Sequence, residues 1–351
     1  MNKIQKFGTY SPAAGTQPEG IGPNGTSTYA GEAASGYIAA ALLSANTLDK
    51  KLVTIMPNVK FKSVIQKLAL SSLISDASCD FNATATASIS EQVLVPEEFQ
   101  VNLQLCKQQF VDSWNALQLG FSAFDEIPKN FNDFLISYVG GNVAQAIEQS
   151  IWQGNGATNG QFDGFELILS ASVATTIGGS STGVLPARVN GGSSAIISGS
   201  VSSTNVISKL QSVVETIPDT VYGKQDLVIY VPTNVAKAYQ LALAGQTAVP
   251  TSATTANGGA NGYQNQFTVG EKPYNFNGID IVLCPGMTAS KIVAAQKSNL
   301  FFGTGLMSDQ NEVKVIDMAN IDGSQNYRVI MRYTAGVQFG VGQDIVYYGA
   351  Y

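Results

Sequence analysis

The chain has 351 residues, of which 44% are hydrophobic and only 13% are charged. Soluble domains typically carry about 25% charged residues, so uncharged polar residues and glycine must cover much of this surface. The sequence contains no histidine, which excludes Ser-His-Asp and Cys-His catalysis and any histidine-ligated zinc site. A chain of this length can bury a large core, and we expect two domains or one large irregular domain.

Cysteine content and apolar runs limit the cellular setting. The three cysteines, Cys79, Cys106 and Cys284, are too few and too widely spaced for a disulfide framework or a structural zinc site. We expect all three to be small buried hydrophobic residues in a reducing compartment. Residues 1–10 lack the apolar region of a signal peptide, and no run reaches the ~18 apolar residues of a membrane span. The sequence therefore predicts neither secretion nor membrane insertion.

The net charge of −6 is unevenly distributed along the chain. Residues 1–70 hold seven lysines and three acidic residues, a net of +4, whereas residues 71–351 hold 12 basic and 22 acidic residues, a net of −10. Residues 8–36 are rich in Gly, Pro, Ser, Thr and Ala and indicate an extended arm without its own core. A basic arm on an acidic body predicts contact with a neighbouring subunit or a polyanion, and a solvated tail is the alternative. The lysines that we assign to such contacts are Lys3, Lys6, Lys50 and Lys51.

A long hairpin is expected over residues 84–106, after a short helix near 38–48 and an apolar stretch broken at Pro57. Apolar and polar residues alternate after Pro96, a pattern typical of a half-exposed antiparallel strand that follows a turn. An isolated hairpin is marginally stable in water. We therefore expect its apolar face to have few partners in its own chain and to be buried against another subunit. That face consists of Val101, Leu103 and Leu105.

The clearest helix is predicted over residues 128–153. Pro128 suits a first helical turn, and apolar residues recur at helical spacing from Phe131 to Ile151. The glycines of Gly154-Asn155-Gly156 predict its end. Gly140-Gly141 near the middle weakens the helix by about 1 kcal/mol per glycine relative to alanine. We expect either a bend or the close approach of another backbone there, and we favour close approach.

The second half of the chain predicts an α/β module and a long final strand. The module comprises helices at 205–217 and 233–244 and strands at 226–231, 279–283 and 291–295, with loops at 170–203 and 250–265. Apolar residues occupy the odd positions from Tyr327 to Val341. This pattern predicts either one unusually long strand or two strands bent at Gly336 or Gly340.

No motif predicts a catalytic residue, a cofactor site or a metal site. The match of residues 179–183 to G-x-S-x-G lacks both the strand–helix context and a histidine. Gly223-Lys224 lacks the other glycine of a phosphate loop, and Asp309 begins a calcium-loop pattern that lacks its glycine and final glutamate. An enzyme that uses only carboxylates and lysine is the remaining catalytic alternative.

The order of these elements, together with residues 93–107 (VLVPEEFQVNLQLCK) and Trp114, resembles one family. The chain is similar to the major capsid proteins of tailed bacteriophages with the Hong Kong 97 (HK97-like) fold, in particular those of the crAss-like and related Bacteroidetes-phage branch. The resemblance implies an α+β fold and covers nearly the whole chain. It implies an N-terminal arm and the start of the P-domain (1–80), an E-loop hairpin (81–110), a P-domain with the spine helix (111–170), an A-domain (171–324) and P-domain C-terminal strands (325–351).

The resemblance also implies a structural, non-enzymatic function. The protein would assemble with itself into hexamers and pentamers and form the icosahedral head that encloses double-stranded DNA without sequence-specific binding. It would be part of the virion after assembly in the host bacterial cytoplasm, with a separate scaffolding protein, a portal and decoration proteins as partners and with no cofactor. Two alternatives remain: an encapsulin-like nanocompartment shell, or a secreted adhesin-like β protein.

Overall fold

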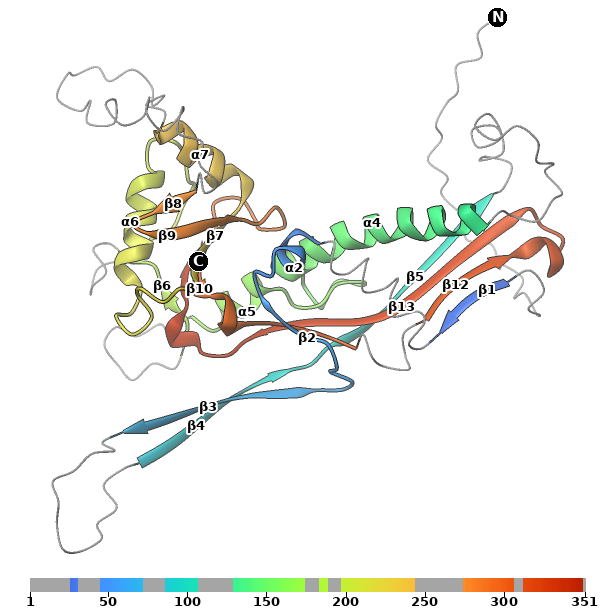
Figure 1. Ribbon diagram of the computed structural model, residues 1–351. Coiled ribbons are helices and arrows are strands. Elements are labelled where there is room, and N and C mark those ends of the chain that lie inside the picture. Colours follow the sequence, from blue (N-terminus) through green and yellow to red (C-terminus); the bar gives the residue numbers. More distant parts are fainter. Residues whose placement is uncertain are drawn as a thin grey trace, which may run out of the picture.

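The computed structural model describes residues 26–30, 45–71, 86–106, 129–173, 183–188, 197–243, 274–305 and 312–349. The molecule is elongated, with two β-sheets arranged along its length and a two-stranded hairpin that projects from the body (Figure 1). Of the predicted arm at 8–36, only residues 26–30 are described. The loop at 250–265, Lys3, Lys6, Cys79, Trp114 and Asp309 lie outside the described residues.

The first sheet is built around β13 (Asn326–Phe339). Its strand order is β1 (Thr26–Ala30), β12 (Glu312–Asp317), β13, β11 (Leu300–Thr304) and β2 (Thr54–Met56), and β5 (Glu97–Cys106) also pairs with β13. The odd positions of β13 point into the core, as the alternation predicts. Of the two expectations for the C-terminal pattern, the single long strand is confirmed, because Gly336 lies inside β13 and pairs with Gly303.

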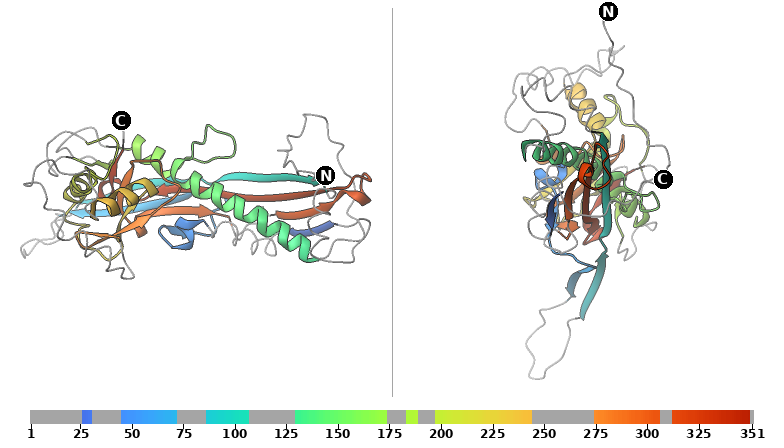
Figure 2. Two further views of the ribbon diagram at one scale, coloured as in Figure 1. Left: turned by 90° about the horizontal axis from the view of Figure 1, so that it is seen from above. Right: turned by 90° about the vertical axis from the view of Figure 1, so that its right-hand side faces the viewer.

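The long helix α4 (Lys129–Gln153) crosses one face of the first sheet (Figure 2). The predicted helix over 128–153 is confirmed to within one residue. Val143, Ile147 and Ile151 are buried on its inner side, whereas Tyr138 is exposed although it fits the predicted stripe. A Cβ on Gly141 would meet no atom of the described chain within 4 Å, whereas Gly140 is buried. The close approach of another backbone to Gly140-Gly141 in the assembly stays a prediction.

Gly154 follows the last residue of α4, and only glycine fits there, because a side chain would collide with the carbonyl oxygens of Ser150 and Phe162. The Gly154 N–H donates to the Ser150 carbonyl at 3.0 Å, and the Gly164 N–H donates to the Gly154 carbonyl at 2.9 Å. The chain thus closes a tight loop and enters α5 (Phe165–Ala171). This confirms the interpretation of residues 154–156 as a helix stop.

The second sheet contains the predicted α/β module. Its order is β6 (Leu185–Pro186), β14 (Val346–Tyr348), β10 (Ile292–Gln296), β7 (Leu227–Val231), β9 (Ile279–Leu283) and β8 (Asn275–Phe276), with α6 (Val206–Thr216) and α7 (Thr233–Leu243) packed on it. Every residue of β7 is buried. Val228 and Tyr230 belong to the core shared with α4, whereas Ile229 and Val231 belong to the core under α6 and α7. A continuous apolar run is the expected pattern for a strand covered on both faces.

The predicted hairpin over residues 84–106 is wrong in its pairing. β4 (Thr86–Leu94) pairs with β3 (Ser63–Ser71), while β5 pairs with β13 over ten residues. Pro96 therefore marks the point where the chain leaves a projecting hairpin and enters the first sheet. Proline suits this change because it has no N–H to donate to either ladder.

The sheets also divide the chain differently from the expected boundaries 171–324 and 325–351. β11 and β12 fall within the first range but lie in the first sheet, and β14 falls within the second range but lies in the second sheet. In the arm, residues 26–30 form β1 and pair antiparallel with β12, and only α2 (Asn46–Asp49) is described of the helix expected near 38–48. Cys284 is fully buried as predicted, and Cys106 is half-buried.

Candidate assembly surface

The root of the β3–β4 hairpin is anchored by Leu94, which is fully buried. Leu94 lies against Gly303 of β11, and Pro96 lies against Gly336 of β13. The absence of a side chain at each glycine lets the hairpin backbone approach the first sheet closely. The amide of Gln338 on β13 also donates to the Val93 carbonyl at 3.0 Å.

Register places alternate hairpin residues on two faces. Val64 pairs with Val93, Gln66 with Glu91 and Leu68 with Ile89, and both members of each pair lie on the same face of the hairpin. We call Val64, Gln66, Ile89, Glu91 and Val93 the outer hairpin face. The amide of Gln66 donates to the carboxylate of Glu91 at 2.7 Å, which fixes the polar pair between two apolar ones.

The apolar part of the outer hairpin face is open to solvent in the single chain. Ile89 is 63% exposed, Val64 45% and Val93 42%. Phe61 and Val95, which flank the root of the hairpin, are more than half exposed. Large apolar side chains gathered on one exposed element mark an interaction surface. A two-stranded hairpin is also marginally stable in water without further packing. The arrangement therefore favours burial of this face against another molecule.

The expectation that Val101, Leu103 and Leu105 have few partners in their own chain is wrong. All three side chains are half-buried and pack on the core of the first sheet. Leu103 lies opposite Val329 in the β5–β13 ladder. Period-two alternation predicted the right strand but not its partner, and the preceding hairpin carries the more exposed apolar face. Contact of Val101, Leu103 and Leu105 with another subunit stays a prediction.

The lysines assigned to intersubunit contact occupy two different settings. Lys50 and Lys51 follow α2 and are exposed. Their contact with another subunit stays a prediction. Lys67, which the sequence did not single out, points from β3 toward the body, and its ammonium lies 3.8 Å from the carboxylate of Asp344.

A buried polar chain attaches the N-terminal segment to α4. The Thr47 N–H and hydroxyl donate to the carboxylate of Glu148 at 2.8 and 2.7 Å, and the same hydroxyl accepts from the Trp152 indole at 2.9 Å. All three residues are buried. Glu148 and Trp152 lie one helical turn apart, so one threonine can reach both. No sequence motif predicts this contact, because Thr47 and Glu148 are 101 residues apart.

The pKa values of two carboxyl groups, those of Glu97 and Glu166, are raised above the ordinary value for glutamate. Burial raises the pKa of Glu97 at the hairpin root, and the nearby charge of Asp163 raises it further. Burial also raises the pKa of Glu166, although its bond from the Thr288 N–H at 2.7 Å and the charge of Lys291 oppose the rise. Among the described residues, no group of three or more metal-ligating side chains lies together. No described helix is long and apolar enough to cross a membrane.

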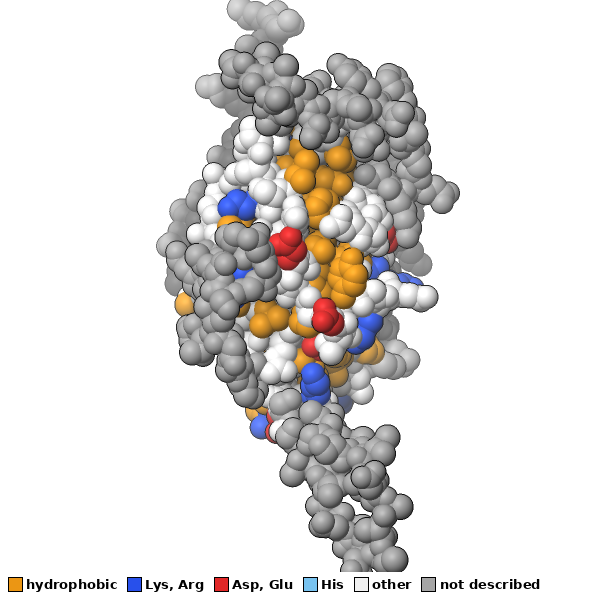
Figure 3. Space-filling model, turned by 90° about the vertical axis from the view of Figure 1, so that its left-hand side faces the viewer, with side chains coloured by type: hydrophobic (Ala, Val, Ile, Leu, Met, Phe, Trp, Pro, Cys, Tyr) orange, Lys and Arg blue, Asp and Glu red, His pale blue; other side chains and the backbone are white. Residues whose placement is uncertain are grey.

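A second exposed apolar area lies at the end of the molecule that carries α6 and α7. Figure 3 shows hydrophobic side chains in a band across the end formed by α6 and α7, with few charged groups among them. Exposed large side chains in this part of the chain include Ile207 on α6 and Leu241 on α7.

Comparison with known proteins shows the fold. No protein-family model matches the chain, and no curated protein matches it significantly. The capsid of an empty GTA particle computed with C5 symmetry matches with 13% identity and a TM-score of 0.52, covering 97% of this chain and 96% of that chain. The capsid of the native GTA particle matches with 11% identity and a TM-score of 0.52 over 97% and 96%. The capsid structure of Cyanophage P-SCSP1u matches with 11% identity and a TM-score of 0.52 over 86% and 88%.

The chain has the HK97-like capsid fold. Both chains in the two GTA comparisons are covered almost completely, so the likeness extends over both sheets, α4 and the hairpin rather than over one module. The α+β class expected from the sequence is confirmed. The described chain presents two exposed apolar areas, one on the projecting hairpin and one at α6 and α7.

Proposed function

We propose that the protein is a major capsid protein: a structural subunit that assembles with itself into hexamers and pentamers of an icosahedral head around double-stranded DNA. The observation that carries the proposal is the outer hairpin face on the projecting hairpin, whose apolar side chains Val64, Ile89 and Val93 are exposed. Likeness over nearly the whole chain to subunits of GTA and cyanophage capsids supports it. The protein would be located in the virion, following assembly in the bacterial host.

The element boundaries suggest how the parts divide. We propose that the E-loop is the β3–β4 hairpin rather than residues 81–110, and that α4 is the spine helix. The P-domain would be the first sheet with α4, and the A-domain would be the second sheet with α6 and α7. The N-terminal arm would run to α2, which is attached to α4 through Thr47.

The proposed partners follow from this role. Copies of the chain would form closed rings through heterologous contacts, in which a hairpin on one subunit meets a different surface on the next. A separate scaffolding protein, a portal and decoration proteins are proposed in addition. The net charge of −6 fits a container that does not adhere tightly to DNA. Placement in the crAss-like branch is a proposal supported by the sequence of residues 93–107.

Electron microscopy and sedimentation of the purified full chain test the proposal. We expect the wild type to form closed shells under assembly conditions. Replacing Ile89 with Asp should leave the free subunit folded, because this side chain is exposed, and should abolish shells by placing a charge where apolar contact is needed. The matched control Ile89→Val keeps the apolar surface and should assemble. Shells of Ile89→Asp at normal yield would overturn the role of the hairpin. A wild type that forms no shells either alone or with the scaffolding protein would overturn the proposed function.

A further inference from the structure

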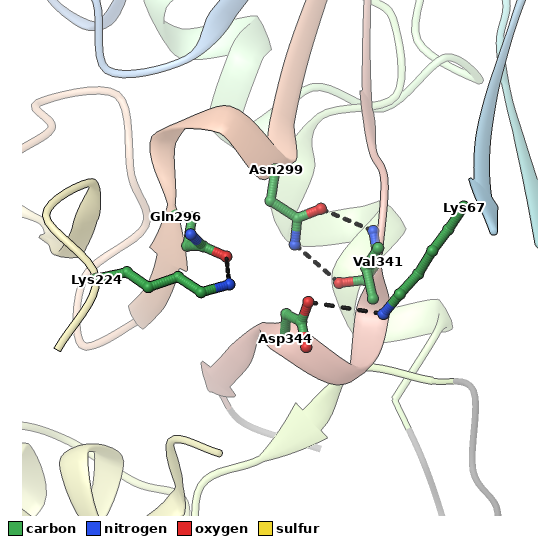
Figure 4. Close-up of polar contacts among 6 residues, drawn as sticks. All are labelled: Lys67, Lys224, Gln296, Asn299, Val341 and Asp344. Atoms are coloured by element: carbon green, nitrogen blue, oxygen red, sulfur yellow. Dashed lines mark hydrogen bonds and ion pairs between the residues drawn. The ribbon is translucent and has the colours of Figure 1, made fainter. Parts of the chain in front are cut away.

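Two chain connections between the sheets run side by side (Figure 4). The short 3-10 helix η2 (Lys297–Asn299) leads from β10 in the second sheet to β11 in the first. Residues 340–345, which include the 3-10 helix η4 (Gly342–Asp344), lead from β13 in the first sheet to β14 in the second. The chain also passes from the first sheet to the second between β5 and β6, through α4 and α5, so these two connections are part of the link between the sheets.

Asn299 joins the two connections with both ends of its amide. Its side-chain oxygen accepts from the Val341 N–H at 2.7 Å, and its side-chain nitrogen donates to the Val341 carbonyl at 2.9 Å. The Asn299 carbonyl also accepts from the Gly340 N–H at 3.0 Å. The asparagine is buried, so these bonds are shielded from water and hold the two segments in one arrangement.

The β3 strand of the hairpin lies next to the connection formed by residues 340–345. A Cβ on Gly340 would lie 2.9 Å from the Asn299 side-chain oxygen and 3.5 Å from Ile65 Cγ2, so Gly340 lies between the joint and β3. Two residues farther along β3, the ammonium of Lys67 lies 3.8 Å from the carboxylate of Asp344 (Figure 4). Asp344 immediately precedes Ile345, whose carbonyl accepts from the Leu185 N–H of the second sheet at 2.9 Å.

The contacts at the hairpin root and beyond it differ in kind. Leu94 at the root is fully buried and apolar, which makes it insensitive to salt. The Lys67–Asp344 pair is partly exposed, with side-chain exposures of 39% and 22%. Exposed ion pairs contribute little to stability and are screened by salt. The buried root fixes the base of the hairpin, whereas the Lys67–Asp344 ion pair is easily broken. This combination would let the angle of the hairpin change about its root.

We propose that the Lys67–Asp344 pair is an electrostatic latch that sets the angle of the hairpin according to the position of the second sheet, with Asn299 as the joint that transmits the position. Asp344 moves with the second sheet through Ile345, and the hairpin follows through Lys67. The latch is a property of the single chain, so it is tested on unassembled protein and its failure would leave the capsid assignment untouched.

The test measures the distance between spin labels on the hairpin and on the second sheet. Ketone-bearing amino acids introduced at Ile89 and at Lys237 on α7 carry the labels, so the native cysteines are unaffected. We expect a narrow distance distribution at about 0.1 M salt that broadens at about 1 M, where screening acts over only ~3 Å. Lys67→Gln should broaden the distribution at low salt and remove the response to salt.

Charge exchange separates a latch from a general structural role. Lys67→Asp combined with Asp344→Lys should restore both the narrow distribution and its salt response. The matched control Lys224→Gln removes a lysine whose ammonium lies 3.4 Å from the Gln296 side chain at the same junction but does not contact the hairpin. It should leave the distribution unchanged. Equal distributions in the wild type, Lys67→Gln and the exchanged pair would overturn the latch.

The role of the joint is tested separately. Asn299→Ala removes both side-chain bonds to Val341 and should broaden the hairpin distance even though Lys67 and Asp344 remain. Asn299→Asp keeps the acceptor for the Val341 N–H but places a carboxylate against the Val341 carbonyl, and should have an intermediate or equal effect. An unchanged distribution in folded Asn299→Ala protein would show that the joint transmits nothing to the hairpin.

Discussion

The side chain of Leu94 occupies the space next to Gly303: a Cβ added to Gly303 would lie 2.5 Å from Leu94 Cδ2 and 3.1 Å from Leu94 Cγ. Real Cβ atoms do not come this close to a neighbour, so Gly303→Ala must displace the anchor of the hairpin. Overpacking of this kind destabilises by roughly 1–3 kcal/mol. Urea unfolding of the monomer should show this loss of stability. A variant as stable as the wild type would mean that the root of the hairpin adapts freely.

Gly141→Ala is the matched glycine substitution with the opposite expected sign. Its added methyl group meets no atom within 4 Å, and alanine favours a helix over glycine by up to about 1 kcal/mol. The free energy of unfolding should therefore rise. If the same variant folds more stably but fails to assemble, a neighbouring subunit packs on this part of α4. A lower stability of the monomer would show that α4 needs the glycine for another reason.

Leu103→Asp should destabilise the monomer itself. Leu103 packs half-buried on the core, opposite Val329, so the substitution places a carboxylate in an apolar contact and should cost about 2–3 kcal/mol. Asn102→Asp is the control, because Asn102 is exposed on the other face of the same strand and should change stability by less than about 0.5 kcal/mol. Thermal unfolding monitored by circular dichroism distinguishes the two. Equal melting temperatures would show that the apolar side chains of residues 101–105 do not pack on the core.

Thr47→Val should weaken the attachment of the N-terminal segment to α4. Valine keeps the shape of threonine but removes the hydroxyl that donates to Glu148 and accepts from Trp152. Leaving buried polar groups without partners costs about 1–3 kcal/mol. Thr47→Ser keeps the hydroxyl and loses one methyl group, worth about 0.8 kcal/mol. Fluorescence of the tryptophans during urea unfolding reports both, and a valine variant no less stable than the serine variant would contradict the prediction.

Glu166 should make stability fall as pH rises. Its pKa is raised in the folded chain, chiefly by burial, so the native state holds its proton to a higher pH than the unfolded state. Stability is lost from about pH 4, the range of an ordinary glutamate, upward through the raised pKa. Glu166→Gln keeps an oxygen for the Thr288 N–H without a charge to bury. Relative to the wild type it should gain stability between pH 4 and 7, as measured by urea unfolding at each pH.

Asp226→Asn is the control of opposite sign. Burial raises the pKa of Asp226, but hydrogen bonds from Ser298 and Gln296 outweigh burial and lower it overall. The wild-type carboxylate therefore adds stability above the pKa of an ordinary aspartate, and this contribution is lost as pH falls. The asparagine variant should lose stability relative to the wild type as pH rises. If both variants follow the same pH trend, one of the two assignments is wrong.

The elements that the sequence predicted are those whose pattern is complete within one segment. The spacing of apolar residues in 128–153, the two helices and three strands of the α/β module, and the alternation from Tyr327 onward each depend on neighbours a few positions away. Helical and extended periodicities are properties of the backbone itself. The absence of histidine excluded whole classes of chemistry before any fold was considered.

The partners of those elements were decided only in three dimensions. Residues 86–94 and 97–106 carry similar alternation, and nothing local shows that one pairs with β3 in a projecting hairpin while the other joins β13, as the Arg328–Gln104 bond across 224 residues illustrates. Which apolar face is buried in the chain and which stays exposed follows from competition among distant segments for the same core. The alternation along one strand cannot predict this outcome, because burial of a face depends on which distant segment packs against it.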